Sequence, residues 1–182
     1  MGQLATTNRR RLRAAANGGY VTPAIAEEVG VPPIEVRKLA VRGGLEHVSR
    51  GVYRFPDLVD DERAPFYEAV LSVGPDAYLT RDSVLAFHGL GLVNPRRIRV
   101  GTTRRVRRNL PDQIEVIRDD LPASDRTVYE GLPSATVERA LRDCVGSIMS
   151  DRLVDAADRA RDEGLLRRRD HARIIEEIGS AR

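Results

Sequence analysis

The stretch 21–55, VTPAIAEEVGVPPIEVRKLAVRGGLEHVSRGVYRF, constrains the fold of this chain more than any other. Thr22 is suited to the position before a helix, because its hydroxyl can accept a hydrogen bond from an unpaired amide of the first turn. Pro23 then occupies the first helical position, where a missing amide costs nothing. A short helix is therefore predicted to begin at Pro23 and to end at Gly30.

A second helix is predicted to begin at Pro32 or Pro33 and to run to Arg42, with Gly43 and Gly44 supplying the left-handed stop. Helical spacing divides its side chains into a packing face and an outward, basic face. The packing face comprises Val36, Leu39, Ala40 and Gly43, and the outward face comprises Ile34, Arg37, Lys38, Val41 and Arg42. The two helices and the tight turn between them form a helix-turn-helix pattern.

A hairpin is predicted directly after the second helix. Residues 45–48 and 52–55 are rich in β-branched and aromatic side chains, and Gly51 between them allows the positive φ that a tight turn needs. Tyr20 and Val21 are expected to form a short strand that pairs with this hairpin. The pattern is typical of a winged helix-turn-helix, in which the hairpin is the wing.

A further helix is predicted over residues 3–16, which would complete a three-helix N-terminal domain. Leu4, Leu12 and Ala15 fall on one face of this helix. Three arginines of the same helix, Arg9, Arg10 and Arg13, project outward. The pattern changes at the acidic stretch 56–61, so the domain boundary is placed near Leu58, with one domain over 1–58 and a second over 59–182.

The second domain is predicted to mix helices with a small antiparallel sheet, which makes the chain an α+β protein. Helices are expected over about 62–73 and over 80–88, the latter capped by Thr80. Between Arg96 and Val128, apolar residues alternate with polar ones, as in strands with one buried face. Three further helices are expected over roughly 136–145, 150–163 and 169–178.

Composition argues against several kinds of site and against a membrane span. Cys144 is the single cysteine and the chain has 3 histidines, so neither a disulfide, a metal site nor a cofactor is expected. Because Cys144 lies in a helical pattern, we interpret it as a buried apolar side chain. No apolar run approaches the ~18 residues of a membrane span, and the N-terminus lacks a signal-peptide core, so a cytoplasmic protein with no membrane contact is expected.

Charge is unevenly distributed along the chain. Residues 1–58 carry 9 Arg/Lys against 5 Asp/Glu, whereas residues 59–182 carry 21 against 22. The excess of positive charge therefore lies with the helix-turn-helix pattern, as binding to an anionic polymer such as DNA requires.

Three short sequence phrases occur in this order along the chain: SRGVYR at 49–54, SVLAFHGL at 83–90 and TVERALRD at 136–143. Together they resemble AbiEi-family antitoxins of type IV toxin–antitoxin systems. The resemblance extends through the helical segment 151–178, and it depends on the ordered set, because each phrase alone is weakly specific.

The resemblance implies two roles. Members pair a winged-helix domain, which binds inverted repeats in their own promoter, with a C-terminal domain that counters a cognate AbiEii-type nucleotidyltransferase toxin. The oligomeric state stays open, with a homodimer on DNA as one option. Some relatives carry an appended nuclease-like domain for which this sequence has no room, so a repressor and antitoxin without catalytic activity is expected.

The expected DNA contacts come from the first helix, the second helix of the helix-turn-helix and the wing. Arg37 is the best suited to a bidentate contact with guanine. Tyr53 and Phe55 are expected to pack inward across the hairpin. The full set is Arg9, Arg10, Arg13, Pro33, Ile34, Arg37, Lys38, Val41, Arg42, Arg50 and Arg54. The alternative is that this basic face is merely solvated.

A second run of arginines falls in the C-terminal domain and would repel itself unless an anion lies nearby. It is interpreted as a toxin-facing surface or as a second DNA contact. The run comprises Arg96, Arg97, Arg99, Arg104, Arg105, Arg107 and Arg108. The alternative is pairing across the sheet with the acidic stretch Asp112, Glu115, Asp119, Asp120 and Asp125.

Other function classes remain open at this point. The winged helix could bind protein, or the chain could be a stand-alone transcriptional regulator. A nucleic-acid-processing enzyme is less favoured: Asp112 and Glu115 faintly resemble a nuclease carboxylate pair, but the lysine expected after the second acid is absent. His88 is expected at the last turn of a helix, where the negative helix end favours a histidine without any catalytic role.

Overall fold

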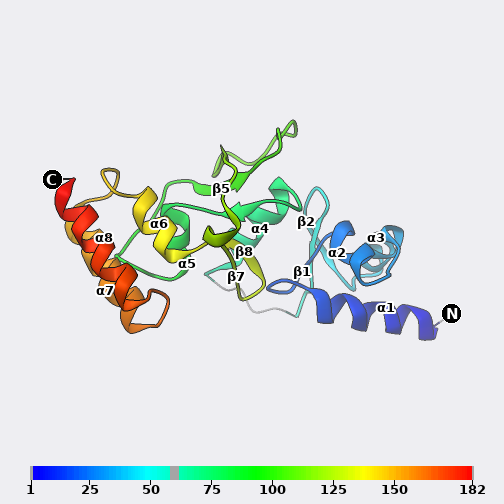
Figure 1. Ribbon diagram of the computed structural model, residues 1–182. Coiled ribbons are helices and arrows are strands. Elements are labelled where there is room, and N and C mark those ends of the chain that lie inside the picture. Colours follow the sequence, from blue (N-terminus) through cyan, green and yellow to red (C-terminus); the bar gives the residue numbers. More distant parts are fainter. Residues whose placement is uncertain (1, 58–61, 182) are drawn as a thin grey trace. The chain divides into compact units, whose positions relative to one another are not determined.

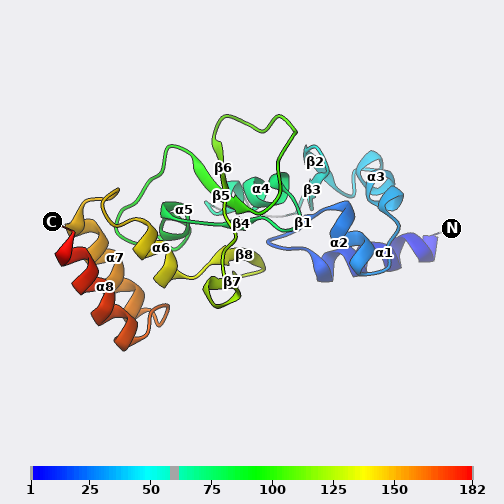
Figure 2. The ribbon, with the colours of Figure 1, turned by 45° about the horizontal axis from the view of Figure 1, so that its top comes forward.

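The computed structural model of the chain describes residues 2–57 and 62–181 (Figures 1 and 2). Within these residues it contains eight α-helices and two sheets, which makes it an α+β protein. Packing divides the chain into two compact units. Unit 1 consists of Met1–Pro75 with Glu130–Leu132, and unit 2 consists of Asp76–Tyr129 with Pro133–Arg182.

Unit 1 contains four helices and a three-stranded antiparallel sheet of order β1-β3-β2. Its elements are α1 (Gly2–Ala15), β1 (Tyr20–Val21), α2 (Pro23–Glu28), α3 (Pro33–Val41), β2 (Glu46–Ser49), β3 (Val52–Arg54) and α4 (Ala64–Val73). Tyr20 pairs with Arg54 and Val21 with Tyr53, so the prediction that this short strand joins the hairpin is confirmed.

The ends of α2 and α3 follow from local chemistry. The hydroxyl of Thr22 accepts a hydrogen bond from the Ile25 amide at 3.2 Å, and Pro23 is the first residue of α2, as predicted. Gly43 ends α3 with φ of 75°. The expectation that Gly44 shares this left-handed conformation is wrong, because Gly43 alone reverses the chain and the Gly44 amide then donates to the Leu39 carbonyl at 2.8 Å. Gly51 adopts φ of 81° in the hairpin turn.

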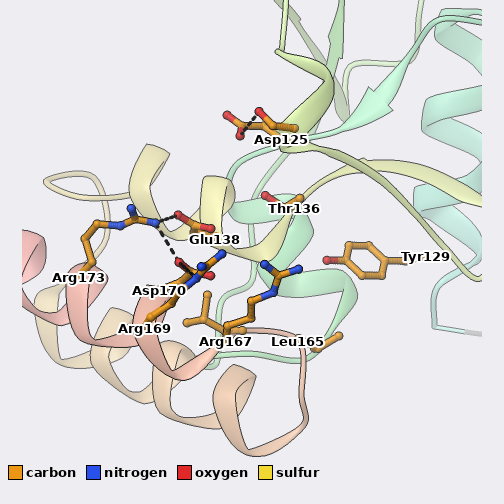
Figure 3. Close-up of a pocket in the computed structure, with 11 residues that line it drawn as sticks. Asp125, Tyr129, Thr136, Glu138, Leu165, Arg167, Arg169, Asp170 and Arg173 are labelled. Carbon is orange, nitrogen blue, oxygen red and sulfur yellow. Dashed lines mark hydrogen bonds and ion pairs between the residues drawn. The ribbon is translucent and has the colours of Figure 1, made fainter.

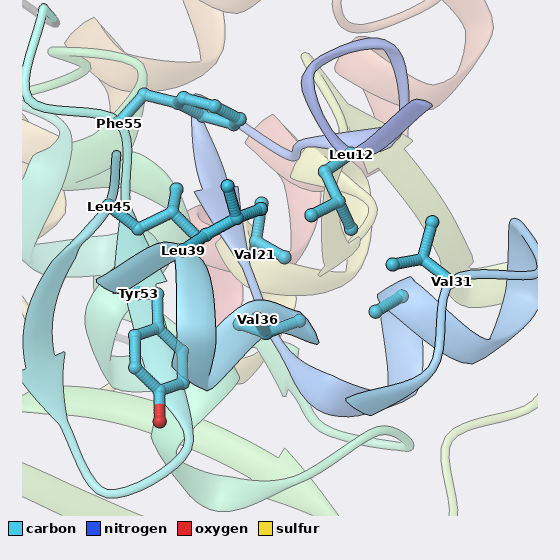
Figure 4. Packing of buried hydrophobic residues seen from close by; sticks show 9 residues of the cluster. Leu12, Val21, Val31, Val36, Leu39, Leu45, Tyr53 and Phe55 are labelled. Atoms are coloured by element: carbon cyan, nitrogen blue, oxygen red, sulfur yellow. The ribbon is translucent and has the colours of Figure 1, made fainter. Parts of the chain in front are cut away.

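One apolar cluster holds α1, α2, α3 and the hairpin together (Figure 4). Figure 4 shows the side chains of Leu12, Val21 and Leu39 directed toward one another. Tyr53 and Phe55 are 7% and 1% exposed, as expected for the inward face of the hairpin. The cluster consists of Leu12, Val21, Ala26, Val31, Val36, Leu39, Leu45, Tyr53 and Phe55. Burying these side chains fixes the angle between α3 and the hairpin.

Helix α4 belongs to unit 1, whereas the sequence boundary near Leu58 assigned it to the second domain. Leu58 itself lies outside the described residues. The hydroxyl of Tyr20 donates to Glu68 at 2.9 Å, and the Ser49 and Ser72 hydroxyls lie 2.9 Å apart. These contacts attach α4 to the sheet, so the structural division falls after Pro75.

Unit 2 is built on a five-stranded sheet of order β6-β5-β4-β8-β7. Its elements are β4 (Tyr78–Leu79), α5 (Asp82–Phe87), β5 (Ile98–Thr102), β6 (Ile114–Arg118), a 3-10 turn η1 (Ala123–Asp125), β7 (Arg126–Tyr129), β8 (Leu132–Ala135, whose first residue is part of unit 1), α6 (Val137–Asp143), α7 (Ser150–Asp162) and α8 (Arg168–Ser180). In both views α7 and α8 lie side by side (Figures 1 and 2).

The prediction of a small antiparallel sheet is wrong. β4 and β5 are antiparallel, but β5 runs parallel to β6 and β4 runs parallel to β8. The segment 103–113 accounts for the β5–β6 pair, because it is long enough to return the chain to the start of a parallel neighbour. Strand β4 has two residues and β8 contains Pro133, a residue disfavoured in strands, so the sequence indicated neither of them.

Thr80 does not cap α5, which corrects a second prediction. Its amide donates to the Arg99 carbonyl at 3.1 Å, so the residue continues the line of β4 instead. The chain then turns at Arg81, which has φ of 55°, and α5 begins at Asp82. Thr136, by contrast, caps α6 as predicted, with its hydroxyl 3.2 Å from the Arg139 amide.

Candidate nucleic-acid interface

A groove of about 430 Å³ lies in unit 1 between the first turn of α3 and the β2–β3 hairpin. It is lined by Pro23, Pro33, Ile34, Arg37, His47, Arg50, Gly51 and Tyr53. Pro33, Ile34, Arg37 and Arg50 belong to the predicted DNA contacts. The structure therefore brings four predicted residues together from two elements.

Apolar carbon forms one wall of this groove. Ile34 is 51% exposed, an unusual state for a large aliphatic side chain. Pro23 and Pro33 also line it and have no amide proton, so neither can donate a backbone hydrogen bond there. The ring of Tyr53 is buried and meets the ring of His47 edge-on, with 5.2 Å between their centroids.

Arg37 and Arg50 are the cations that the groove presents. Both are exposed, and neither forms an ion pair or a side-chain hydrogen bond with the part of the chain that the structure describes. Lys38 differs, because its ammonium lies 2.7 Å from Glu35. The guanidinium donors of Arg37 and Arg50 are thus available to a ligand.

The other predicted contacts lie outside the groove. Val41 is 88% exposed and Arg42 follows it at the end of α3. Arg54 pairs with Glu46 at 2.7 Å across the hairpin. Arg9 and Arg10 are exposed on α1.

Arg13 is engaged within unit 1. Its guanidinium lies 2.6 Å from Asp57 and 4.6 Å from the ring centroid of Phe55. The hydrogen bond from Arg13 lowers the pKa of the Asp57 carboxyl. Because both side chains are well exposed, this pair contributes little to stability.

Sequence reasoning missed four groove residues: Pro23, His47, Gly51 and Tyr53. His47 stands opposite Tyr53 in the hairpin register. The hairpin was predicted, so the pairing of these two side chains could have been found from the register alone. The position of Pro23 beside α3 depends on the angle between the helices, and the sequence pattern carries no signal for that angle.

The second arginine run lies in unit 2 at and around β5. Arg99 pairs with Glu115 at 3.1 Å and also with Asp82, so pairing with the predicted acidic stretch is confirmed for this one member. Arg104 lies 3.4 Å from Asp76, and Arg108 also interacts within the chain.

Four members of the run, Arg96, Arg97, Arg105 and Arg107, are exposed and have no ion pair among residues 2–57 and 62–181. Several residues of the predicted acidic stretch form ion pairs with arginines outside this run instead. Asp119 and Asp125 lie 3.7 and 3.0 Å from Arg139, and Asp120 lies 3.6 Å from Arg126. Asp112 is exposed in the loop before β6.

Unit 2 also contains a polar pocket of about 680 Å³ beside the first turn of α8 (Figure 3). Figure 3 shows Glu138 and Asp170 facing Arg173. Glu138 pairs with Arg142 at 2.9 Å and with Arg173, and Asp170 pairs with Arg173 at 3.1 Å. These opposite charges neutralise one another. The ion pair between Glu138 of α6 and Arg173 of α8 connects the two helices beside the pocket.

His88 and Cys144 both pack against other side chains of unit 2. His88 lies at the end of α5 as predicted, with its ring edge-on to Phe87 and Tyr129 at centroid distances of 5.2 and 4.4 Å. Cys144 is 1% exposed, and burial raises the pKa of its thiol to about 12. The prediction of a buried cysteine is confirmed, and a thiol with such a pKa is unreactive at neutral pH.

No cluster of three or more His, Cys, Asp or Glu side chains that could hold a metal ion occurs in the described part of the chain. Among the helices described, none combines the length and apolar character needed to cross a bilayer.

Comparison with known proteins identifies the segment that forms the groove. Residues 10–56 match the family model described as "Transcriptional regulator, AbiEi antitoxin". No curated protein matches the chain. The crystal structure of the RV2827C protein from Mycobacterium tuberculosis is similar over 97% of this chain and 76% of that one, with 17% identity and a TM-score of 0.44.

The matched segment begins in the middle of α1 and ends just after β3, so it includes every element that lines the groove. It also includes the phrase SRGVYR at 49–54, while the phrases at 83–90 and 136–143 lie outside it. The likeness to the AbiEi antitoxin family of transcriptional regulators therefore covers residues 10–56, the segment that forms the groove.

Proposed function

We propose that this protein is the antitoxin of a type IV toxin–antitoxin system, and that it represses its own operon by binding promoter DNA. In this proposal unit 1 acts as a winged helix-turn-helix, with α2 and α3 as the two helices and the β2–β3 hairpin as the wing. The observation that supports it most is the groove at the start of α3, where Arg37 and Arg50 have no partner among the described residues.

Helix α3 is the recognition helix. Its first turns enter the major groove, and Arg37 donates two hydrogen bonds to a guanine. Arg50 at the tip of the wing contacts the phosphate backbone or the minor groove. Arg9 and Arg10 on α1 add phosphate contacts. A promoter occupied in this way excludes RNA polymerase, which accounts for repression.

A mobility-shift titration tests DNA binding. The probe is a fragment upstream of the gene of this protein, with a scrambled fragment of equal length as competitor. With ~5 phosphates neutralised per half-site, the logarithm of affinity should fall against log salt with a slope of about −4 to −5. Equal affinity for both fragments, or affinity that is nearly independent of salt, would contradict the proposal and favour a winged helix that binds protein.

The second role is toxin neutralisation by residues 59–182, with a nucleotidyltransferase as the partner. Arg105 and Arg107 support a protein contact there, because they are exposed on the loop between β5 and β6 and have no ion pair with the described residues. Cationic side chains of this kind attract an acidic partner surface and accelerate association. Co-expression with the product of the neighbouring gene measures this role as recovery of growth.

A further inference from the structure

We infer that Ile34 reads the 5-methyl group of a thymine in the operator, beside the guanine bound by Arg37. This inference rests on the proposed DNA binding and adds to it the identity of a base. Ile34 is the second residue of α3 and is 51% exposed within the groove. In a recognition helix, the N-terminal residues are those that reach base edges.

The chemistry around Ile34 selects an apolar ligand. Pro33 precedes it in the helix and Pro23 also lines the groove, and neither residue can donate a backbone hydrogen bond. The ring of the buried Tyr53 also lines the groove, whose donors are the side chains of His47, Arg37 and Arg50. A phosphate oxygen in the groove would be bound by Arg37 or Arg50, whereas against the Ile34 side chain it would lose its water without gaining a donor. The thymine methyl is the one apolar group that B-DNA displays in its major groove.

The spacing of Ile34 and Arg37 fits neighbouring base pairs. Residues three apart on a helix lie on one face, with Cβ atoms about 5–6 Å apart. Successive base pairs are separated by about 3.4 Å along the DNA axis. Glu35 and Lys38 pair with each other at 2.7 Å, so the charges next to Ile34 are already satisfied within the helix.

The test removes the methyl and nothing else. Each thymine in the bound promoter fragment is replaced in turn by uracil, and affinity for the protein is measured by fluorescence anisotropy. Replacement at the contacted position should weaken binding about fourfold, the value of one buried methyl group. Replacement at other positions should leave affinity unchanged.

Variants of the protein test whether the Ile34 side chain is the group that contacts the thymine methyl. Ile34→Ala should bind thymine and uracil fragments equally, because its shorter side chain does not reach the methyl. Val128→Ala is the matched control: Val128 is an exposed aliphatic residue of β7 in unit 2 that lies outside the groove and outside the predicted DNA contacts, and this variant should keep the fourfold preference for thymine.

Two results would overturn the inference while leaving DNA binding intact. One is specific binding by the unaltered protein with no loss at any uracil position. The other is an Ile34→Ala variant that keeps the full preference for thymine. A protein that fails to distinguish the promoter fragment from scrambled DNA would instead overturn the proposed function, and the inference would fall with it.

Discussion

Arg37 and Lys38 are consecutive cations on α3, yet they present different chemistry to a ligand. The ammonium of Lys38 is 2.7 Å from Glu35, whereas Arg37 lines the groove and has no ion pair with the described residues. A lysine that already has a carboxylate partner must lose it before it can bind a phosphate or a base. Base recognition therefore falls to Arg37.

Replacing Arg37 by alanine should reduce affinity for the promoter fragment by roughly 1–3 kcal/mol and relax specificity at one position. Lys38→Ala should cost less, because it removes a cation that is already neutralised. Both side chains are exposed, so the free energy of unfolding should stay within about 0.5 kcal/mol of that of the parent. Anisotropy titrations and urea denaturation measure the two quantities; an equal loss of affinity in both variants would refute the assignment to Arg37.

Asp76 is a carboxylate of unit 2 whose contribution to stability should depend on pH. Burial alone would raise its pKa, but hydrogen bonds from the Thr103 and Thr102 hydroxyls, each 3.0 Å from Oδ2, outweigh it and leave the pKa below its ordinary value. A carboxyl with a lowered pKa in the folded state stabilises the protein above the unfolded pKa of about 3.9, and this contribution is lost as the pH falls through the folded value.

Asp76→Asn should therefore lower the free energy of unfolding by about 1 kcal/mol at neutral pH. The difference from the parent should shrink as the pH falls below about 3.9 and vanish below the folded pKa of Asp76. Urea denaturation at a series of pH values measures this difference. Asp112→Asn, which alters an exposed carboxylate, serves as the control and should follow the parent throughout. A difference at Asp76 that stays constant with pH would show that its charge contributes nothing.

At the scale of elements, the sequence predicted a helix well where a capping hydroxyl or a proline marks its beginning. Thr22 and Thr136 cap the helices they were expected to cap, and Gly51 turns the hairpin. Sheet direction was not predicted, because alternation of apolar residues indicates which face of a strand is buried and not whether its neighbour runs parallel, as β5 and β6 do. The groove was half predicted, since Ile34, Arg37 and Arg50 follow from helix and turn patterns but Pro23 depends on how α2 packs against α3.

Two glycines in the turn after α5 have similar backbone conformations but different packing, so replacing each one tests how tightly this turn packs against α7. Gly89 and Gly91 have φ of 66° and 65°. A Cβ on Gly89 would meet nothing within 4 Å, whereas one on Gly91 would lie 2.6 Å from the Arg152 carbonyl oxygen and 2.9 Å from the Ala156 Cβ of α7. The turn is thus pressed directly onto the backbone of α7.

Gly89→Ala should cost about 1–2 kcal/mol of unfolding free energy, the strain of a left-handed conformation. Gly91→Ala should cost this amount and about 1–3 kcal/mol more, because α7 must move to admit the methyl group. Denaturant unfolding of the two variants isolates the packing contribution as their difference. Equal losses would mean that the turn can shift away from α7 freely.

At the scale of the whole molecule, the two proposed roles use different groups of arginines. Reversing Arg105 and Arg107 to glutamate should abolish recovery of growth in the presence of the toxin and leave the salt slope of promoter binding unchanged. Reversing Arg9 and Arg10 should do the opposite, flattening the salt slope by about 2 while preserving neutralisation. Circular dichroism of each variant checks that folding is intact. Loss of both roles in either variant would contradict this separation.

Unit 1 is assembled from two stretches of chain, and this has a consequence for biosynthesis. The Tyr67 hydroxyl donates to the Glu130 carbonyl at 2.8 Å, Arg63 pairs with the Glu130 carboxylate at 2.6 Å, and Glu130–Leu132 is part of this unit. When the ribosome has translated Pro75, α1 to α4 have been synthesised. Glu130, which Arg63 and Tyr67 contact, has not yet been synthesised. The N-terminal unit is therefore completed only after most of the β-strands of unit 2 have been translated, which ties the timing of its maturation to synthesis of the segment proposed to neutralise the toxin.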